Sequence, residues 1–243
     1  MGIYKLYFLP YAGASEMTYK KWKKFFKDTN IEFKVLDYAG HGNRNSENYI
    51  TTIKETCEDI YNLIKEDNKE DKPFFLAGHC LGAIIAYELC YLISEKKEIS
   101  NPAGIFISGH GAPDKVVYEH ICDMNDEKLI NYLYEQGNLK EEMLQKEMRN
   151  IVNEVVLPPL RADSKLYESY VYNKERKALD LDFYVLYGNN DWKCPKEEIK
   201  RWDEFIESPI KYYEYSGGHY FINNLYKECA KDIMNIILQY DWY

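Results

Sequence analysis

The 243-residue sequence predicts an α/β fold in which helices flank a mostly parallel central sheet. Two observations predict this fold. Short β-branched or aromatic runs alternate with longer stretches of helical period, a pattern typical of parallel sheets covered by helices on both faces. The alternation fails between about residues 112 and 169, where helical segments follow one another without a strand. We therefore expect one domain over residues 1–243, with residues 112–169 as an inserted helical lid.

Each expected strand is a short apolar run bounded by turn-forming residues. The strands are expected at residues 3–9, 32–37, 74–78, 104–108, 181–187 and 210–215. Helices are expected at residues 17–27, 51–65, 81–95, 196–207 and 225–240. In the second and the last of these helices, apolar residues recur every three or four positions, so each helix has one face for the core. Cys57 and Cys229 lie on these faces and are predicted to be core residues.

The inserted segment carries a wide apolar stripe that must bury against another element. The stripe consists of Leu144, Met148, Ile151 and Val155, widened by Val152 and Val156. The Leu-Pro-Pro-Leu run at residues 157–160 is then predicted to stop the helix, because proline lacks a backbone N–H. If the segment covers the carboxyl edge of the sheet, where open α/β folds place ligands, it lines a substrate channel. Otherwise it is an additional packed helical layer.

The composition excludes several classes of protein. The chain carries 31 basic and 40 acidic residues, a net charge of −9, without a sustained basic block, which excludes a nucleic-acid partner. The longest nearly apolar run, residues 81–93, is shorter than the roughly 18 residues that suggest a membrane span. No membrane association is expected, and the first residues show no targeting pattern, so we expect a cytoplasmic protein. We also expect a monomer. The six cysteines lack a CxxC pair and metal-ligand spacing, so free thiols are expected, with no metal and no other cofactor.

Residues 74–87 hold the most informative pattern in the sequence. An apolar strand ends at Gly78, a helix begins near Leu81, and Gly78 and Gly82 flank Cys80 at two positions on either side. This is the G-x-S-x-G pattern of a nucleophile elbow, with Cys in place of Ser. The glycines leave room for the tight turn that lifts the nucleophile above the sheet. Cys80 is therefore the candidate nucleophile.

An acid and a histidine follow Cys80 in the order that such an elbow requires. Asp191 comes after the strand expected at 181–187, and His219 after the strand expected at 210–215. This order of nucleophile, acid and base is that of an α/β-hydrolase. His219 would hold or accept the Cys80 proton, Asp191 would orient the imidazole, and the thiolate would attack an acyl carbonyl to give an acyl-enzyme. We predict a catalytic triad of Cys80, Asp191 and His219.

An oxyanion hole is expected to complete this site. The backbone N–H of Leu81, directly after the nucleophile, is one donor. The second donor should come from the loop after the first strand, where either Tyr11 or Ala12 could supply the N–H.

The other histidines are expected to lie outside the catalytic machinery. His41 lies in a glycine-flanked loop, for which a structural role is expected, and His79 is expected to pack or hydrogen-bond beside the elbow. His110 and His120 begin the inserted segment and show no recognisable pattern.

Six short motifs together resemble the type II thioesterases, the stand-alone editing enzymes of nonribosomal peptide and polyketide synthetases. They are LPYAGA at 9–14, GHGNR at 40–44, GHCLGA at 78–83, LPPLRAD at 157–163, GNND at 188–191 and GGHYF at 217–221. The resemblance runs from about residue 3 to residue 224. It implies an α/β-hydrolase with a helical lid that hydrolyses acyl or peptidyl thioesters from the phosphopantetheine arm of a carrier protein, as in antibiotic biosynthesis. The family's catalytic Ser, Asp and His fall on Cys80, Asp191 and His219.

The departure from the family is Cys80, where Ser is usual. A thioester acyl-enzyme stays at the energy level of the carrier thioester, so an amine can attack it as well as water. An acyltransferase or release cyclase, which passes the Cys80-bound acyl group to an amine or hydroxyl, is therefore a second hypothesis. A non-catalytic carrier-protein-binding module is a third, against which the presence of both Asp191 and His219 argues.

Overall fold

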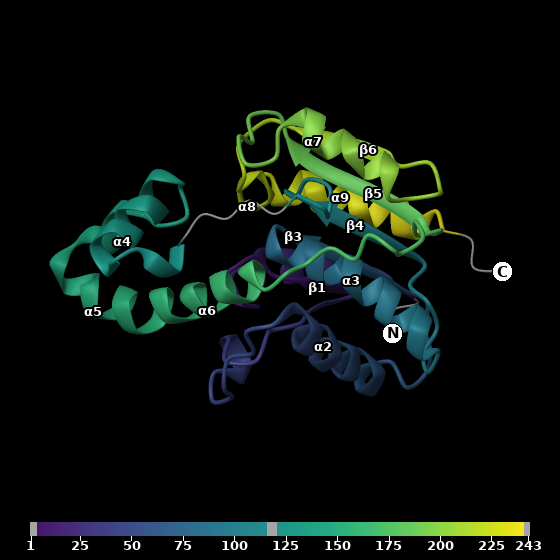
Figure 1. Ribbon diagram of the computed structural model, residues 1–243, viewed down its shortest axis with the longest axis horizontal. Helices are drawn as coiled ribbons and strands as arrows, with labels where there is room; N and C mark the ends of the chain where they lie inside the picture. The colour runs from purple at the N-terminus through teal and green to yellow at the C-terminus, as the bar shows by residue number, and fades with distance from the viewer. Residues whose placement is uncertain (1–3, 116–120, 241–243) are drawn as a thin grey trace.

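Six parallel strands form one sheet in the computed structural model, which describes residues 4–115 and 121–240 (Figure 1). The sheet order is β2-β1-β3-β4-β5-β6, and every neighbouring pair is parallel. The strands are β1 (Tyr4–Leu9), β2 (Ile31–Val35), β3 (Phe74–His79), β4 (Gly104–Ser108), β5 (Asp182–Gly188) and β6 (Lys211–Tyr215). Each lies within two residues of its expected bounds, which confirms the α/β fold with a parallel sheet. The carboxyl ends of all six strands meet at one edge of the sheet.

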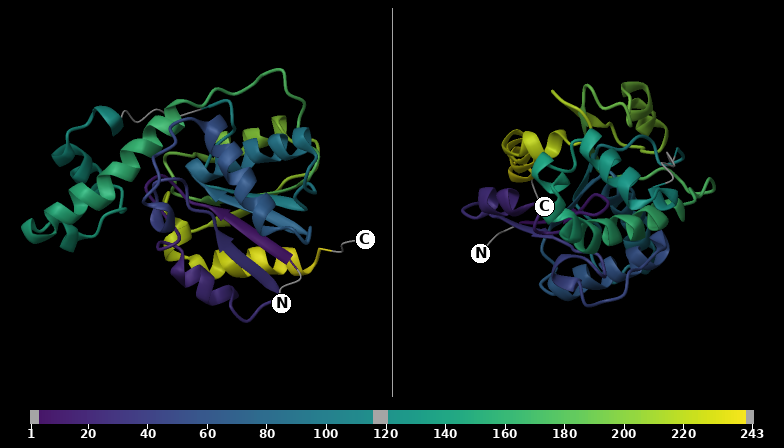
Figure 2. Two further views of the ribbon diagram at one scale, coloured as in Figure 1. Left: turned by 90° about the horizontal axis from the view of Figure 1, so that it is seen from below. Right: turned by 90° about the vertical axis from the view of Figure 1, so that its left-hand side faces the viewer.

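Helices cover both faces of the sheet, as predicted. On one face, α2 (Ile53–Asp67) and α3 (Leu81–Lys96) pack into one apolar core. On the other face, α1 (Lys20–Phe26) and α9 (Tyr226–Leu238) lie side by side and share a second core (Figure 2). Cys57 and Cys229 are buried in these two cores, which confirms their predicted role. None of the helices in the described part of the chain is both long and apolar enough to cross a membrane.

The region between β5 and α9 contains shorter helices than expected. The helix expected at 196–207 is present as α7 (Lys196–Lys200), which tightens into a 3₁₀ turn at Arg201–Glu204. A further short helix, α8 (Phe221–Asn224), follows the loop after β6.

The helical segment between β4 and β5 projects from the sheet (Figure 1). It contains a 3₁₀ turn at Ile121–Asp123, α4 (Asp126–Glu135), α5 (Arg149–Ile151) and α6 (Leu157–Glu168), with further 3₁₀ turns at Glu141–Leu144 and Lys146–Met148. The segment has an apolar cluster of its own, formed by Ile121, Leu129, Ile130, Leu133, Leu139, Val152, Leu157 and Leu160. Ala12, from the loop after β1, packs against this cluster and so connects the segment to the carboxyl edge of the sheet.

The two prolines do not stop the helix, contrary to the prediction. A π-helical turn at Val152–Val156 joins α5 to α6, and Pro158 and Pro159 lie in the first turn of α6. Proline is tolerated there because the first N–H groups of an α-helix have no partner within it.

The predicted apolar stripe was also wrong in part. Ile151 and Val155 are 46% and 64% exposed, whereas Val152 is fully buried and Val156 partly so. A π-helical turn has more residues per turn than an α-helix. Residues spaced three or four apart in the sequence therefore do not stay on one face of the helix here. Val152 and Val156, instead of Ile151 and Val155, contact the apolar cluster of the segment.

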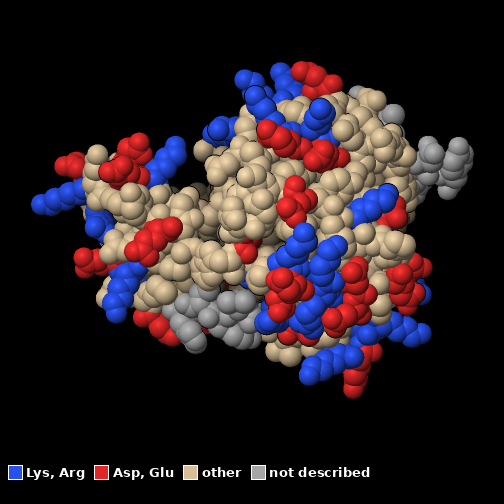
Figure 3. Space-filling view, turned by 90° about the horizontal axis from the view of Figure 1, so that it is seen from above, with Lys and Arg blue, Asp and Glu red and all other residues tan. Residues whose placement is uncertain are grey.

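Acidic and basic side chains are interleaved on the surface. Figure 3 shows the two charges side by side over one face of the molecule. The ion pairs of the described residues include Arg201 with Asp114, at 2.6 Å, and Lys196 with Glu214, at 3.1 Å. The net charge is therefore not gathered into one acidic patch on this face.

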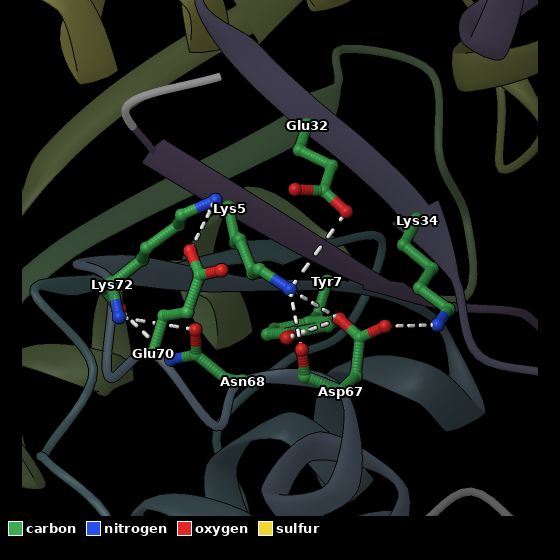
Figure 4. A network of polar contacts seen from close by, with 8 residues as sticks. All are labelled: Lys5, Tyr7, Glu32, Lys34, Asp67, Asn68, Glu70 and Lys72. Carbon is green, nitrogen blue, oxygen red and sulfur yellow. Dashed lines mark hydrogen bonds and ion pairs between the residues drawn. The ribbon is translucent and has the colours of Figure 1, made fainter. Parts of the chain in front are cut away.

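A partly buried ionic network connects α2 to β1 and β2 (Figure 4). Lys5 is 5% exposed, and its Nζ donates to the carbonyl oxygen and to Oδ2 of Asp67, each at 2.7 Å. Asp67, the last residue of α2, also accepts hydrogen bonds from Tyr7, at 2.7 Å, and from Lys34. Burial raises the pKa of Asp67, but the hydrogen bonds from Lys34, Lys5 and Tyr7 outweigh it and hold this pKa at about 2.

Candidate active site

Cys80 occupies a strained turn between β3 and α3. Its backbone has φ 53° and ψ −116°, in the positive-φ region that non-glycine residues rarely adopt. The flanking glycines are required by close backbone contacts. A Cβ on Gly82 would lie 2.1 Å from the carbonyl oxygen of Leu9, and one on Gly78 would lie 2.0 Å from the carbonyl oxygen of Gly82. The turn has the strand–turn–helix geometry that the sequence predicts around Cys80, and Cys80 is partly exposed.

Asp191 and His219 come from the loops after β5 and β6, and the fold brings them into contact. Oδ2 of Asp191 lies 2.8 Å from Nδ1 of His219, and the two side chains are 0% and 5% exposed. Oδ1 of Asp191 accepts the backbone N–H of Lys193 at 3.0 Å, which fixes the carboxylate. The pair therefore holds the imidazole with Nδ1 toward the carboxylate and leaves Nε2 for another partner.

The charge of the imidazole is stabilised by its neighbours. Burial lowers the pKa of His219, but the charge of Cys80 and the hydrogen bond to Asp191 outweigh it and raise this pKa well above its ordinary value. Cys80 and His219 line the same cavity. An imidazolium beside a thiolate is the arrangement that activates cysteine as a nucleophile.

A cavity of about 290 Å³ extends from Cys80 and His219. Ala12 and Leu81 line it at the edge of the sheet, and Ile121 and Tyr167 line it from the helical segment. Its surface is mainly apolar, which suits a hydrocarbon-containing ligand placed next to the thiol.

The two candidates for the early oxyanion donor have different surroundings. Ala12 lines the cavity together with Cys80 and Leu81. The Tyr11 ring instead packs against His79 and Tyr220, and its hydroxyl accepts a hydrogen bond from Asn223 at 3.1 Å.

Asp163 on α6 connects the segment to two loops at the edge of the sheet. This carboxylate is fully buried, and its Oδ2 accepts the Gly13 N–H at 2.7 Å and lies 3.0 Å from Nε2 of His41. The other ring nitrogen of His41 lies 3.1 Å from the carbonyl oxygen of Ala39. Burial lowers the pKa of His41, but the hydrogen bond and charge of Asp163 outweigh it and raise this pKa. His41 thus makes the structural contacts expected of it. Asp163 holds Gly13, the residue next to Ala12, through the Gly13 N–H.

Two further histidines lie beside the site. His79 is fully buried, with Nδ1 2.9 Å from Oγ of Ser108 and its ring tilted by 43° to that of His219, so it packs and hydrogen-bonds as expected. Burial and the charge of His219 hold the pKa of His79 well below its ordinary value. His110 lines the cavity and lies 2.7 Å from the Tyr167 hydroxyl through Nε2, and burial lowers its pKa to about 4. His120 lies outside the described residues.

Cys194 is the part of the site that sequence reasoning missed. This thiol is 6% exposed and lines the cavity, and its Sγ lies within 4.8 Å of ligand atoms of Asp191 and His219. Burial raises the pKa of Cys194. The signal available in the sequence was its position three residues after Asp191, in the same loop.

Known proteins similar to this chain include several thioesterases. The chain matches the family model described as Thioesterase domain over residues 4–237. It is 26% identical over 234 residues to Thioesterase PikA5 of Streptomyces venezuelae, covering 96% of this chain and 81% of that protein. It is 30% identical over 224 residues to gramicidin S biosynthesis protein GrsT of Aneurinibacillus migulanus, covering 90% and 82%.

A solved structure with the same fold is YbtT, a type II thioesterase from the yersiniabactin NRPS/PKS biosynthetic pathway. The TM-score is 0.82 at 22% identity, and the match covers 96% of this chain and 92% of that one. Because the family model extends from the start of β1 into α9, across the whole sheet and the candidate site, the chain belongs to the Thioesterase domain family and is a thioester hydrolase.

Proposed function

We propose that this protein is a type II thioesterase that hydrolyses acyl or peptidyl thioesters from the phosphopantetheine arm of carrier proteins in nonribosomal peptide or polyketide biosynthesis. The observation that carries the proposal is the contact between His219 and Asp191 beside a cavity that also contains Cys80. The similarity to Thioesterase PikA5, to the gramicidin S biosynthesis protein GrsT and to the type II thioesterase YbtT of the yersiniabactin pathway supports the choice of substrate.

The proposed reaction has two steps, and Cys80 is the nucleophile in the first. Its thiolate attacks the acyl carbonyl carbon, the bond from this carbon to the pantetheine sulfur breaks, and His219 gives its proton to the departing thiolate. His219 then takes a proton from a water molecule that attacks the acyl-enzyme. The bond to Cys80 Sγ breaks, and the free acid leaves. Asp191 orients the imidazole and stabilises its charged form through the 2.8 Å contact.

In both steps the acyl oxygen carries developing negative charge, and we assign its stabilisation to the N–H groups of Leu81 and Ala12. Both residues line the cavity next to Cys80, which is where such donors are needed. This choice favours Ala12 over Tyr11.

The buried Asp163 accepts the N–H of Gly13 and so positions the adjacent Ala12, whose N–H is assigned to the oxyanion hole. Asp163→Asn is therefore expected to lower kcat for thioester hydrolysis about 10- to 100-fold, with KM changed much less. The substitution replaces the charged acceptor of the Gly13 N–H and the partner of His41. Steady-state kinetics with a small acyl thioester measures both constants. Asp126→Asn is the matched control, because Asp126 forms a partly exposed ion pair with Arg161 in the same segment. Equal effects of the two substitutions on kcat would contradict the assignment.

We propose that the helical segment is a lid within a single domain. Ile121 and Tyr167 of the segment form part of the cavity wall, so the segment lies where an acyl chain attached to Cys80 would extend. This placement favours the lid over a merely additional packed layer.

Acyl transfer is the second candidate function, and Cys80 is the observation that favours it. An acyl group on sulfur remains a thioester, which an amine attacks readily. An acyltransferase or release cyclase would use the same first step and would differ in the acceptor.

Intact-mass measurement of an acyl-loaded carrier protein tests the proposal. The wild-type enzyme is expected to release free acid with turnover and to carry a transient added acyl mass, whereas Cys80→Ala does neither. Cys122→Ser, which removes a thiol in the helical segment, serves as the control and should behave as wild type. An added acyl mass that resolves only when an amine is supplied would favour transfer. Release of acid by Cys80→Ala at the wild-type rate would overturn the role of Cys80.

A further inference from the structure

Two thiols and an imidazole converge at one end of the cavity. Cys80 lies on the elbow after β3, Cys194 lies on the loop after β5, and His219 lies on the loop after β6. All three line the same cavity. Both thiols lie close enough to the His219 ring to contribute to raising its pKa. The proposed hydrolysis uses only one of them, so Cys194 has no part in the triad mechanism.

The His219 ring is already oriented as a metal ligand would be. Its Nδ1 faces Asp191 at 2.8 Å, whereas its Nε2 is buried and has no hydrogen-bond partner among the described residues. Histidines that bind zinc commonly direct one ring nitrogen to a carboxylate and coordinate the metal with the other. Asp191 therefore supplies the outer contact that such a histidine needs.

The donor types agree with zinc, and two of the three proposed ligands already lie close together. Ligand atoms of Asp191, Cys194 and His219 all lie within 4.8 Å of one another. Cys80 is not in this group, but it lines the same cavity and interacts with both His219 and Cys194. Tetrahedral ligands at Zn–S and Zn–N bond lengths lie about 3.5 to 4 Å apart, so the Cys80 side chain must move toward Cys194 when the metal binds. Thiolate and imidazole are the ligands that this ion prefers, and a set of two Cys and one His leaves a fourth position open for water.

We propose that Cys80, Cys194 and His219 form a Zn²⁺-binding site, with Asp191 bound to the far side of the imidazole. Binding releases two protons to solvent, one from the Cys194 thiol and one from the Cys80–His219 pair, so both sulfurs coordinate as thiolates and Nε2 as the nitrogen of a neutral imidazole. The Cys80 sulfur and His219 Nε2 are then occupied by the metal. The ion therefore blocks attack on a thioester, and zinc acts as an inhibitor of the enzyme.

Zinc binding can be measured on the free protein without any acyl substrate, so its outcome is independent of the proposed hydrolysis. Wild-type protein, kept reduced by a phosphine, is titrated with Zn²⁺ in competition with a chromogenic chelator. We expect one ion per chain, and an affinity at least about 100-fold lower for Cys194→Val. Titration with Co²⁺ should give a thiolate-to-metal charge-transfer band in the near-ultraviolet, weaker in Cys194→Val because one thiolate is lost.

Cys122→Ser is the matched control, because the Sγ of Cys122 contacts the carbonyl oxygen of Arg161 in the helical segment and is not part of the cluster. It should bind zinc as wild type does. Circular dichroism checks that each variant is folded, and Cys194→Ala replaces Cys194→Val if the valine does not fit. Equal zinc affinity of wild type and a folded Cys194 variant would overturn the proposal, as would a wild type that binds no stoichiometric zinc.

Discussion

Replacing His219 with alanine is expected to lower kcat/KM for thioester hydrolysis by at least about 10³-fold. The imidazole supplies the proton for the leaving thiol and accepts the proton of the attacking water in the proposed mechanism. It also balances the charge of Cys80, whose influence helps to raise the pKa of His219. Loss of the ring removes all three contributions. Steady-state hydrolysis of an acyl thioester measures the effect.

Chemical rescue separates a catalytic role of His219 from a structural one. Imidazole added to His219→Ala should restore part of the lost rate, because the deleted ring leaves a gap next to the cavity that admits a small base. The free energy of unfolding of the variant, measured in urea, shows whether the fold is intact. A folded variant that keeps more than about a tenth of the wild-type rate would contradict the assignment of His219 as general acid and base.

Asp67→Asn is expected to lower the free energy of unfolding by about 3 kcal/mol, because it leaves the buried ammonium of Lys5 without its main counter-charge. Lys5 and Asp67 side chains are 7% and 18% exposed, and Glu32, at 3.7 Å from Lys5, compensates only in part. Urea unfolding at neutral pH measures the change. Glu66→Gln on the same helix is the control, since Glu66 pairs with Lys69 at an exposed site and should have little effect. A change no larger than that of the control would refute the prediction.

The effect of Asp67 should also depend on pH in a defined direction. The folded-state pKa of Asp67 is about 2, below its ordinary value of 3.8. A carboxyl group with a lowered folded-state pKa stabilises the protein above its unfolded-state pKa and loses this contribution as the pH falls through the folded-state value. The difference in unfolding free energy between wild type and Asp67→Asn should therefore be constant above about pH 5 and shrink between about pH 4 and pH 2. A difference that grows with acidity would contradict the assignment.

The sheet and the three triad candidates were predictable because they depend on local patterns. Each strand is an apolar run with clear boundaries, and Cys80, Asp191 and His219 each follow such a run directly. Since the carboxyl ends of parallel strands meet at one edge, residues placed after three of them must lie near one another. The large separation of Cys80, Asp191 and His219 along the chain therefore did not prevent the prediction that they lie near one another.

The helical segment was less predictable because its geometry departs from a regular helix. The π-helical turn at Val152–Val156 changes which residues share a face, so Ile151 and Val155 are exposed although their spacing suggested burial. After this turn, Pro158 and Pro159 lie in the first turn of α6. A periodicity of 3.6 residues per turn predicts neither the exposure of Ile151 and Val155 nor a helix that begins at the prolines.

Contacts made across the fold were also absent from the sequence patterns. Asp163 joins Gly13 and His41 from positions far away along the chain, and no spacing rule links these three. Cys194 is one of the six cysteines whose spacing shows no pattern, because its neighbourhood is created by the pairing of β6 with β5. Such residues become visible only when the loops are placed in space.

The separate apolar cluster of the helical segment bears on how this enzyme can diverge. Eight residues of the segment form a cluster of their own, while the two larger cores on either face of the sheet are built by other residues. A mutation at Ile121, which lines the cavity and belongs to this cluster, therefore reshapes the cavity wall without replacing a residue of either sheet core, whereas Tyr167 packs against one of them. Selection can alter the acyl group that is accepted without disturbing the strands that hold Cys80, Asp191 and His219, so substrate preference and stability can evolve separately.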